Sequence, residues 1–343
     1  MSSLTQTLLI QLADGQFHSG TALGRQAGRT RTAVWKSIQT LKQNGLPIYA
    51  VRGKGYRLAE PVELLSRSKI LAELDNIADE NLATKYLQQL DVFYDIESTN
   101  AYLLNIAKKD DYSARACLAE LQNAGRGRRG RRWVSPFGGN IYLSLLWRFT
   151  AGASQLGGLS LAIAVAVIRA LRAIGFDDAR VKWPNDILIK GQKLAGILLE
   201  LSGESAGPCA VVIGIGLNVR AAGAEMAAVD QAWTDLETEL GKKVSRNLLT
   251  AQLLYQVILA VQEFESEGLR PFMKEWAVCD EFADCEVIMN LPQGNVHGIA
   301  RGIDESGALL LVTEDGVHRY HSGEVSMRAL TPKGHAMKEC ATK

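Results

Sequence analysis

The stretch Gly125-Arg126-Gly127-Arg128-Arg129-Gly130-Arg131-Arg132-Trp133 is the most distinctive segment of this chain. It places three glycines among five arginines directly after a β-rich apolar run that ends near Leu121. Glycines let a backbone bend and approach a ligand closely, and arginines present planar, charged donors that suit phosphate and carboxylate groups. The segment therefore predicts a loop at the end of a strand that binds a phosphate-bearing small molecule. A basic surface loop or a second nucleic-acid contact is the alternative interpretation.

Around this loop the chain has a series of short apolar runs. One long apolar helix, which we expect from Gln155 to Ile174, interrupts them. Short runs of β-branched and apolar residues bounded by turns are typical of strands. The expected strands are Val92–Ile96, Cys117–Leu121, Ile141–Leu146, Val181–Trp183, Ile187–Ile189, Leu194–Leu201 and Ala210–Ile215. This order predicts an α+β domain built on a mostly mixed or antiparallel sheet.

Three further clusters follow the loop. In the first, Lys182-Trp183-Pro184-Asn185-Asp186, a strand runs into a proline turn, so Lys182 is expected inside or at the mouth of a cleft. There it can stabilise developing negative charge, and Asp186 can pair with it or share in holding Mg²⁺; an exposed hairpin turn is the alternative. In the second, Gly196 within an apolar strand after Lys193 suggests close approach of a ligand. In the third, Asn218 follows a strand and can read the edge of adenine, or serve as a simple turn residue.

The first 60 residues have a different character, with eight basic and two acidic side chains. Leucines at helical spacing, potential caps at Ser19 and Thr30, and a Gly28-Arg29 turn predict a helix-turn-helix. A hairpin with a basic tip follows and is suited to contact phosphates as a wing. The expected DNA-binding residues are Arg31, Thr32, Trp35, Lys36, Gln39, Arg52 and Lys54. A small helical domain with a solvated basic face is the alternative.

Composition limits the remaining possibilities. The chain has 343 residues and a net charge of 38 − 37 = +1, with 47% apolar and 22% charged residues, which excludes wholesale disorder and predicts two or three domains. The five cysteines are scattered, without a CxxC pair, so we expect a reducing, cytoplasmic setting. The uncharged segment between Arg148 and Arg169 is diluted by glycine and polar residues, so we expect no membrane partner.

These clusters, in this order, resemble one family: the bifunctional biotin–protein ligase that doubles as the repressor of the biotin operon. The matching stretches are Glu97-Ser98-Thr99-Asn100, Gln122 with Gly125–Trp133, Lys182–Asp186, Lys193–Leu198 and Gly214–Asn218, together with the N-terminal helix-turn-helix and its Gly-Lys-Gly wing. The resemblance covers about residues 5–330. It implies that biotin and ATP with Mg²⁺ form biotinyl-5′-AMP, which then acylates a lysine of a biotin carboxyl carrier domain of the acetyl-CoA carboxylase type.

The resemblance also implies roles for single residues. The biotin-binding set is Ser98, Thr99, Asn100, Gln122, Gly125, Arg126, Gly127, Arg128, Lys193, Gly196 and Leu198. The catalytic set is Lys182, Arg126 and Arg128; the adenylate-binding set is Arg129, Trp133 and Asn218; and Asp186 is the expected Mg²⁺ ligand. Trp133 would stack on adenine, and Gly196 and Leu198 would lie against the biotin tail.

The family likeness implies a multidomain α+β fold. Residues 1–63 would form a winged helix-turn-helix, 64–280 the ligase domain, 281–331 an SH3-like β-barrel and 332–343 a flexible tail. It further implies that biotinyl-5′-AMP is the corepressor, and that the liganded protein forms a homodimer on operator DNA. Two alternatives stay open: a ligand-sensing repressor without catalysis, and a lipoyl-type ligase on the same fold.

Overall fold

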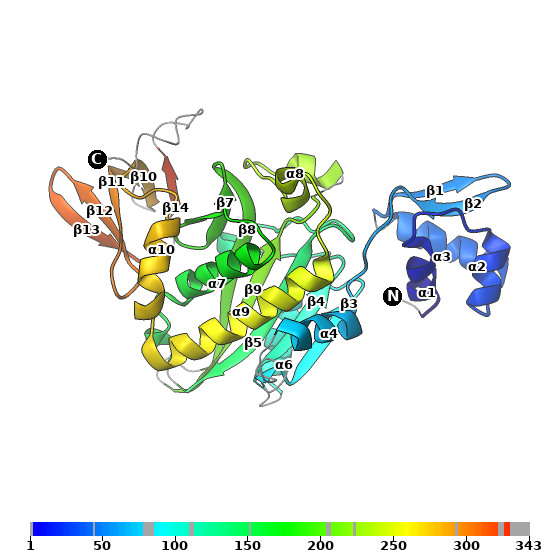
Figure 1. The fold of residues 1–343 in the computed structure, drawn as a ribbon, viewed down its shortest axis with the longest axis horizontal. Coiled ribbons are helices and arrows are strands. Elements are labelled where there is room, and N and C mark those ends of the chain that lie inside the picture. The colour runs from blue at the N-terminus through cyan, green and yellow to red at the C-terminus, as the bar shows by residue number, and fades with distance from the viewer. Residues whose placement is uncertain are drawn as a thin grey trace.

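The computed structural model describes residues 3–43, 45–77, 86–109, 113–150, 152–203, 207–221, 224–291, 294–321 and 326–329. The central sheet and its helices lie between an N-terminal helical unit and a C-terminal β-sheet (Figure 1). The predicted tail, 332–343, lies outside the described residues, as do positions 330 and 331.

The N-terminal unit has the predicted helix-turn-helix and hairpin. Its elements are α1 (Ser3–Leu12), α2 (Gly20–Gln26), α3 (Arg31–Gln43), β1 (Ile48–Val51) and β2 (Gly55–Leu58). The expected caps are present, because Ser19 Oγ accepts from the Ala22 N–H at 3.0 Å and Thr30 Oγ1 accepts from the Ala33 N–H at 3.2 Å. At Gly55 a Cβ would lie 2.0 Å from the His18 carbonyl oxygen, so only glycine lets the hairpin close against the loop before α2.

The central sheet has seven described strands in the order β3-β4-β5-β9-β8-β7-β6. They are β3 (Gln89–Phe93), β4 (Arg115–Ala119), β5 (Ile141–Phe149), β6 (Arg180–Lys182), β7 (Asp186–Ile189), β8 (Gln192–Gly203) and β9 (Cys209–Leu217). Strands β3 and β4 pair parallel, and the other neighbouring pairs are antiparallel. The predicted mixed sheet is thereby confirmed.

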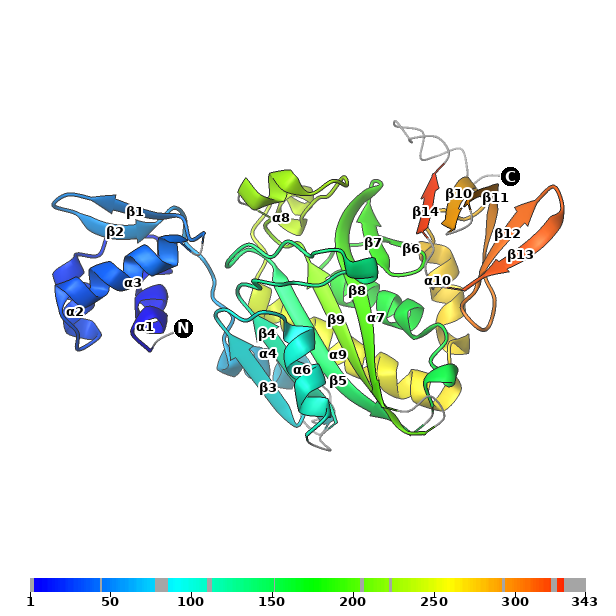
Figure 2. The same cartoon turned by 180° about the vertical axis from the view of Figure 1, so that it is seen from behind.

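Helices cover both faces of this sheet. The helices α4 (Arg67–Ile77), α7 (Leu159–Ala173) and α9 (Arg246–Glu267) lie on one face, and α6 (Thr99–Ala107) lies on the other (Figures 1 and 2). The uncharged segment between Arg148 and Arg169 contains the last residue of β5, a short 3-10 helix and most of the buried helix α7. Within the described ranges, no helix is long and apolar enough to cross a bilayer. Shorter helical elements are η2 (Arg128–Gly130), η3 (Ala153–Gln155), η4 (Ala224–Ala228), α8 (Leu236–Leu240), η5 (Arg270–Phe272) and α10 (Met273–Cys279).

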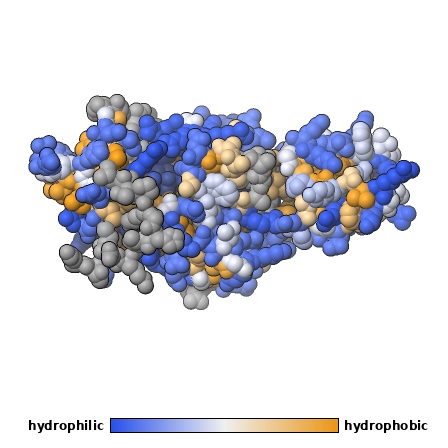
Figure 3. Space-filling view, turned by 90° about the horizontal axis from the view of Figure 1, so that it is seen from above, coloured by the Kyte–Doolittle hydropathy of each residue, from blue (hydrophilic) through white to orange (hydrophobic). Residues whose placement is uncertain are grey.

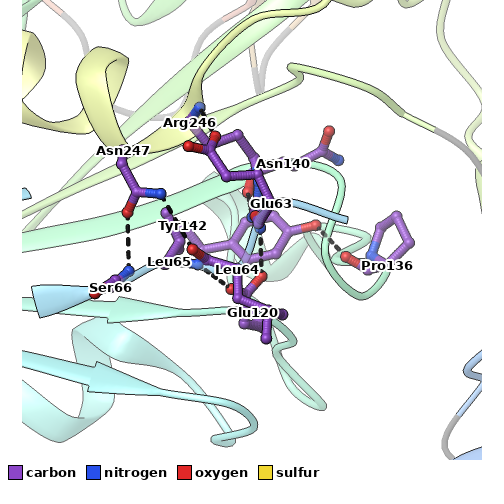
Figure 4. Close-up of polar contacts among 10 residues, drawn as sticks. All are labelled: Glu63, Leu64, Leu65, Ser66, Glu120, Pro136, Asn140, Tyr142, Arg246 and Asn247. Atoms are coloured by element: carbon purple, nitrogen blue, oxygen red, sulfur yellow. Dashed lines mark hydrogen bonds and ion pairs between the residues drawn. The ribbon is translucent and has the colours of Figure 1, made fainter. Parts of the chain in front are cut away.

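The linker between β2 and α4, residues 59–66, is held by a buried ion pair (Figure 4). Glu120 follows β4 and Arg246 begins α9; their side chains are 1% and 4% exposed, with Oε2 and Nη2 2.8 Å apart. Glu120 also accepts from the Leu65 N–H, and Arg246 donates to the Glu63 carbonyl oxygen. Arg246 donates further to the Asn140 carbonyl oxygen at 2.9 Å. The pair therefore joins the linker to both the sheet and the segment after the arginine-rich loop.

The C-terminal strands form a five-stranded antiparallel sheet in the order β13-β12-β11-β10-β14. They are β10 (Glu286–Leu291), β11 (Gly294–Ile303), β12 (Leu309–Thr313), β13 (Gly316–Tyr320) and β14 (Ser326–Ala329). Over the described residues, the edge strands β13 and β14 are not paired with each other. The predicted β-structure is present, but the sheet is open and the SH3-like barrel is not confirmed.

Replacing Arg246 by Met tests the importance of the buried ion pair. The variant leaves the Glu120 carboxylate buried without its cation, so the free energy of unfolding should fall by about 3–5 kcal/mol. Urea unfolding followed by circular dichroism measures this change. Arg301→Met is the matched control, because Arg301 and its partner Asp284 are half exposed or more and its loss should change stability little. Equal stability of both variants would contradict the assigned role.

Candidate active site on one face of the central sheet

The strand register places separate sequence clusters on one face of the sheet. Lys182 pairs with Asp186, Asp186 with Gly196, and Gly196 with Gly216. Residues directly opposite each other on neighbouring strands share a face. The three predicted clusters after the loop, 182–186, 193–198 and 214–218, therefore meet in one row across β6, β7, β8 and β9, although they lie far apart in sequence.

A bulge in β8 turns Lys193 onto the same face. Ile187 pairs with Ala195 but Leu188 pairs with Lys193, so β8 carries one extra residue at this point. Such bulges re-aim side chains. Lys193 Nζ lies 2.8 Å from Asp186 Oδ1 and 5.4 Å from the centroid of a Trp133 ring.

Glycines leave this face free for other side chains. A Cβ at Gly216 would lie 2.4 Å from Trp133 Cε2, and one at Gly196 would lie 3.0 Å from Trp133 Cζ3. A Cβ at Gly214 would lie 2.3 Å from Asn100 Oδ1. The indole of Trp133 and the amide of Asn100 therefore lie directly on the backbone of β8 and β9. The predicted stacking of Trp133 on adenine, and of Gly196 on a biotin tail, stay predictions.

The predicted biotin-binding side chains form a buried polar network at the start of α6. The Thr99 N–H and Oγ1 donate to Gln122 Oε1 at 2.9 and 3.1 Å. Ser144 Oγ lies 2.7 Å from Thr99 Oγ1 and 2.6 Å from Asn100 Oδ1. Ser98 caps the helix, its Oγ accepting from the Ala101 N–H at 3.3 Å. Buried polar groups need partners, so the network holds these side chains in fixed orientations.

The arginine-rich loop forms a small turn. The Gly127 N–H donates to the Arg131 carbonyl oxygen at 2.7 Å, and Arg129 adopts a left-handed conformation with φ 60°, which is unfavourable for a residue with a Cβ. A pocket of about 610 Å³ lies here. It is lined by Asn123, Ala124, Gly125, Arg126, Gly127, Arg128, Arg129, Gly130, Arg131, Arg132, Leu198 and Glu200.

Two arginines of the loop reach the sheet. Arg126 Nη1 lies 3.0 Å from Glu200 Oε1, and Arg128 Nη1 donates to Asn185 Oδ1 at 2.9 Å. Neither Glu200 nor Ser144 was predicted from the sequence as a site residue. The sequence signal that could have identified them is a polar residue within an otherwise apolar strand. Glu200 also follows Gly196 and Leu198 at two-residue spacing, so it lies on the same face of the strand.

Burial affects the pKa of two basic residues of the site. It lowers the pKa of Lys182, while the Asp186 carboxylate raises it again and nearby cations lower it further. Burial likewise lowers the pKa of Arg128, again opposed by Asp186. A desolvated cation interacts more strongly with an anion than one in water. The site therefore offers concentrated positive charge to an anionic ligand.

The remaining predicted residues stand as follows. Asn218 is buried and its Nδ2 donates to the Thr234 carbonyl oxygen at 3.1 Å. This hydrogen bond holds the segment around Thr234 in place. Asp186 is engaged by Lys193, and in the described ranges no three His, Cys, Asp or Glu residues form a metal-holding group. Contact of Asn218 with adenine, and of Asp186 with Mg²⁺, stay predictions.

The predicted DNA-binding residues gather on the N-terminal unit. Arg31, Thr32, Trp35, Lys36, Arg52 and Lys54 are exposed, and Gln39 is half-buried. Arg57 supports the hairpin, its Cζ lying 5.2 Å from the ring centroid of Phe17 and 5.5 Å from that of Tyr49. Figure 3 shows a strongly hydrophilic tip at the right-hand end, where the turn of the β1–β2 hairpin lies in Figure 1.

Three protein-family signatures match this chain. The signature of the Biotin/lipoate A/B protein ligase family covers residues 92–218, that of the Biotin protein ligase C terminal domain covers 285–328, and that of an HTH domain covers 5–57. The chain is 43% identical to the Bifunctional ligase/repressor BirA of Salmonella typhimurium over 94% of this chain and 97% of that protein. It is 42% identical to the Escherichia coli protein of the same name over 94% and 96%.

A solved structure is similar over the larger part of the chain. The biotin protein ligase from Aquifex aeolicus, in complex with biotin and ATP, shares 28% identity at a TM-score of 0.61. The match covers 71% of this chain and 99% of that protein.

Replacing Gly216 by Ala tests the contact between Trp133 and the sheet. The added methyl group would overlap the indole, so the variant should lose about 1–3 kcal/mol of stability in urea unfolding. In a Trp133→Ala background the same substitution should cost much less, because the obstructing ring is gone. An equal cost in both backgrounds would show that the two residues do not compete for this space.

Proposed function

The chain belongs to the family of bifunctional biotin–protein ligases and repressors, and we propose that it joins biotin to a carrier protein in two steps. The observation that carries this proposal is the convergence of Lys182, Lys193 and the arginine-rich loop over one glycine-lined face of the sheet. In the first step, the biotin carboxylate attacks the α-phosphate of ATP to give biotinyl-5′-AMP and pyrophosphate. In the second, a carrier lysine displaces AMP.

In the first step the protein brings two anions together. Thr99, Asn100 and Gln122 hold the polar ring of biotin, and Arg126 and Arg128 contact its carboxylate and the phosphate. Lys182, desolvated beside Asp186, stabilises the negative charge that develops during the attack. Lys193 contacts the activated carboxyl group. Trp133, Asn218 and Arg129 hold the adenylate.

No enzyme nucleophile is needed, because the carrier lysine attacks the adenylate directly. The four described cysteines are buried, and burial raises the pKa of the Cys117, Cys209 and Cys279 thiols, which disfavours reactive thiolates. Catalysis is therefore assigned to positioning and charge stabilisation.

Mg²⁺ fits this site only as a companion of ATP. Asp186 is a single carboxylate already paired with Lys193, whereas Mg²⁺ is commonly held by one or two carboxylates together with substrate phosphates. The ion would neutralise phosphate charge, and Asp186 would supply one oxygen ligand.

The N-terminal unit supports a second activity, repression by binding operator DNA. Helix α3 presents its polar residues as a recognition helix and the β1–β2 hairpin supplies a basic wing. We propose that biotinyl-5′-AMP is the corepressor and that the liganded chain forms a homodimer, whose two-fold symmetry matches a palindromic site. The carrier domain would compete for the liganded form by consuming the adenylate.

The C-terminal unit is assigned to support of the ligase site. We propose that its sheet assists the binding of ATP and the biotin carboxyl carrier domain. A cytoplasmic location remains our expectation, since biotin carrier domains and an operator would both be met there.

Ligase activity is tested with biotin, ATP and a biotin carrier domain. Mass spectrometry should find one biotinyl group on one carrier lysine, with pyrophosphate released. Lys182→Met should slow pyrophosphate release about 100-fold or more. Lys190→Met is the matched control, because Lys190 lies on the turn between β7 and β8, is largely exposed and pairs with Glu239; it should leave the rate near that of the unsubstituted protein.

Two outcomes would overturn the ligase proposal. Absence of any mass gain together with absence of pyrophosphate release would leave only a sensing role. Modification with lipoate in preference to biotin would identify a lipoyl-type ligase.

Operator binding is tested in the presence of biotin and ATP by fluorescence anisotropy at several salt concentrations. Lys36→Ala should weaken binding and reduce the slope of log K against log salt by about 1, while biotin ligation is unchanged. Lys42→Ala, at the far end of the same helix, is the control. Equal effects of both variants would contradict the assigned face of α3.

A further inference from the structure

Glu200 on β8 connects two parts of the site that are otherwise separate. Its Oε2 accepts from Asn100 Nδ2 at 2.8 Å, and its Oε1 lies 3.0 Å from Arg126 Nη1. Asn100 belongs to the buried polar network, whereas Arg126 belongs to the loop. One carboxylate therefore contacts the buried polar network with one oxygen and the arginine-rich loop with the other.

The path of polar contacts is continuous from the end of β4 to the loop. It runs from Gln122 to Thr99, from Thr99 through Ser144 to Asn100, and from Asn100 to Glu200 and Arg126. The first four of these residues are buried. A shift of Gln122 or Thr99 on ligand binding would therefore change the position of Arg126 through this path.

The contact between Glu200 and Arg126 differs from an ordinary surface ion pair. Their side chains are 24% and 50% exposed, which by itself would make the pair worth little. However, Asn100 cannot turn freely, because its Oδ1 contacts Ser144 and its amide fills the space above Gly214. Glu200 is thus held from the interior of the protein, and Arg126 binds to an acceptor whose position is set.

Charge supports the same role. Glu200 is the acidic residue among the residues that line the loop pocket, which include five arginines. It contacts only the Nη1 group of Arg126, and a guanidinium has five N–H donors in all. Glu200 can therefore orient Arg126 and reduce repulsion within the loop without occupying the whole guanidinium.

We propose that Glu200 is a positioning residue that orients Arg126 toward the anion of biotinyl-5′-AMP and couples this arginine to the ring pocket. The inference rests on the proposed ligase function. It assigns Glu200 no contact with the ligand; its effect passes through Arg126 on one side and Asn100 on the other.

The test compares Glu200→Gln, Arg126→Ala and the double variant. Glutamine keeps an oxygen acceptor for Asn100 but removes the charge that holds Arg126. The half-life of biotinyl-5′-AMP on Glu200→Gln should therefore fall about tenfold, equivalent to about 1.4 kcal/mol, while the KM for biotin changes much less. In the Arg126→Ala background the same substitution should shorten the half-life no further. Glu263→Gln is the control: it alters a carboxylate on α9 that lies 3.6 Å from Arg169 of α7.

The outcomes separate this inference from the function on which it rests. If the unsubstituted protein forms no adenylate, the ligase proposal fails. If it forms adenylate but Glu200→Gln retains it equally well, or shortens the half-life equally with and without Arg126, the positioning role is wrong. If Glu200→Gln has a lowered melting temperature, Glu200→Asp serves as a second variant. It keeps the charge but withdraws it from both Asn100 and Arg126. It must also shorten the half-life of the adenylate only when Arg126 is present.

Discussion

The proposed active-site face of this protein depends on the absence of side chains at the centre of the sheet. Gly196, Gly214 and Gly216 lie where β8 and β9 pair, and the space of their missing Cβ atoms is filled by Trp133 and Asn100. Side chains larger than hydrogen would lift the indole and the amide off the backbone. Because these two groups lie so close to the strands, the arginine-rich loop can fold down to Glu200 and Asn185.

The same chain segments join the site to the N-terminal unit. After Trp133, Ser135 accepts from Gln122 Nε2 at 3.2 Å, and the carbonyl oxygen of Asn140 accepts from Arg246. Arg246 and Glu120 in turn hold the linker backbone (Figure 4). The arginine-rich loop therefore leads into a segment that is anchored to the linker, so the site and the N-terminal unit have a shared structural support.

Much of this arrangement could be predicted from local sequence. The helix-turn-helix followed from leucine spacing and from caps at Ser19 and Thr30, and the loop from its glycines and arginines. These signals are local, since a cap or a turn depends on residues a few positions apart. The prediction of a mixed sheet followed in the same way from short apolar runs.

What the sequence did not reveal depends on contacts between distant segments. The row from Lys182 to Gly216 requires the strand register, and the orientation of Lys193 requires a bulge. Glu200 and Arg246 are ordinary charged residues in sequence, and their partners lie 74 and 126 positions away. The open C-terminal sheet differs from the expected barrel because alternation of apolar residues predicts strands, not whether the edges of a sheet meet.

The central claim is that the arginine-rich loop binds the activated form of biotin. Hydrogen exchange of the backbone amides of residues 125–133, followed by mass spectrometry before and after addition of biotin and ATP, measures this directly. The account predicts that exchange in this segment slows about tenfold or more once adenylate has formed, while the solvent-exposed β13 is unaffected. Unchanged exchange in the loop, with adenylate demonstrably bound to the protein, would contradict it.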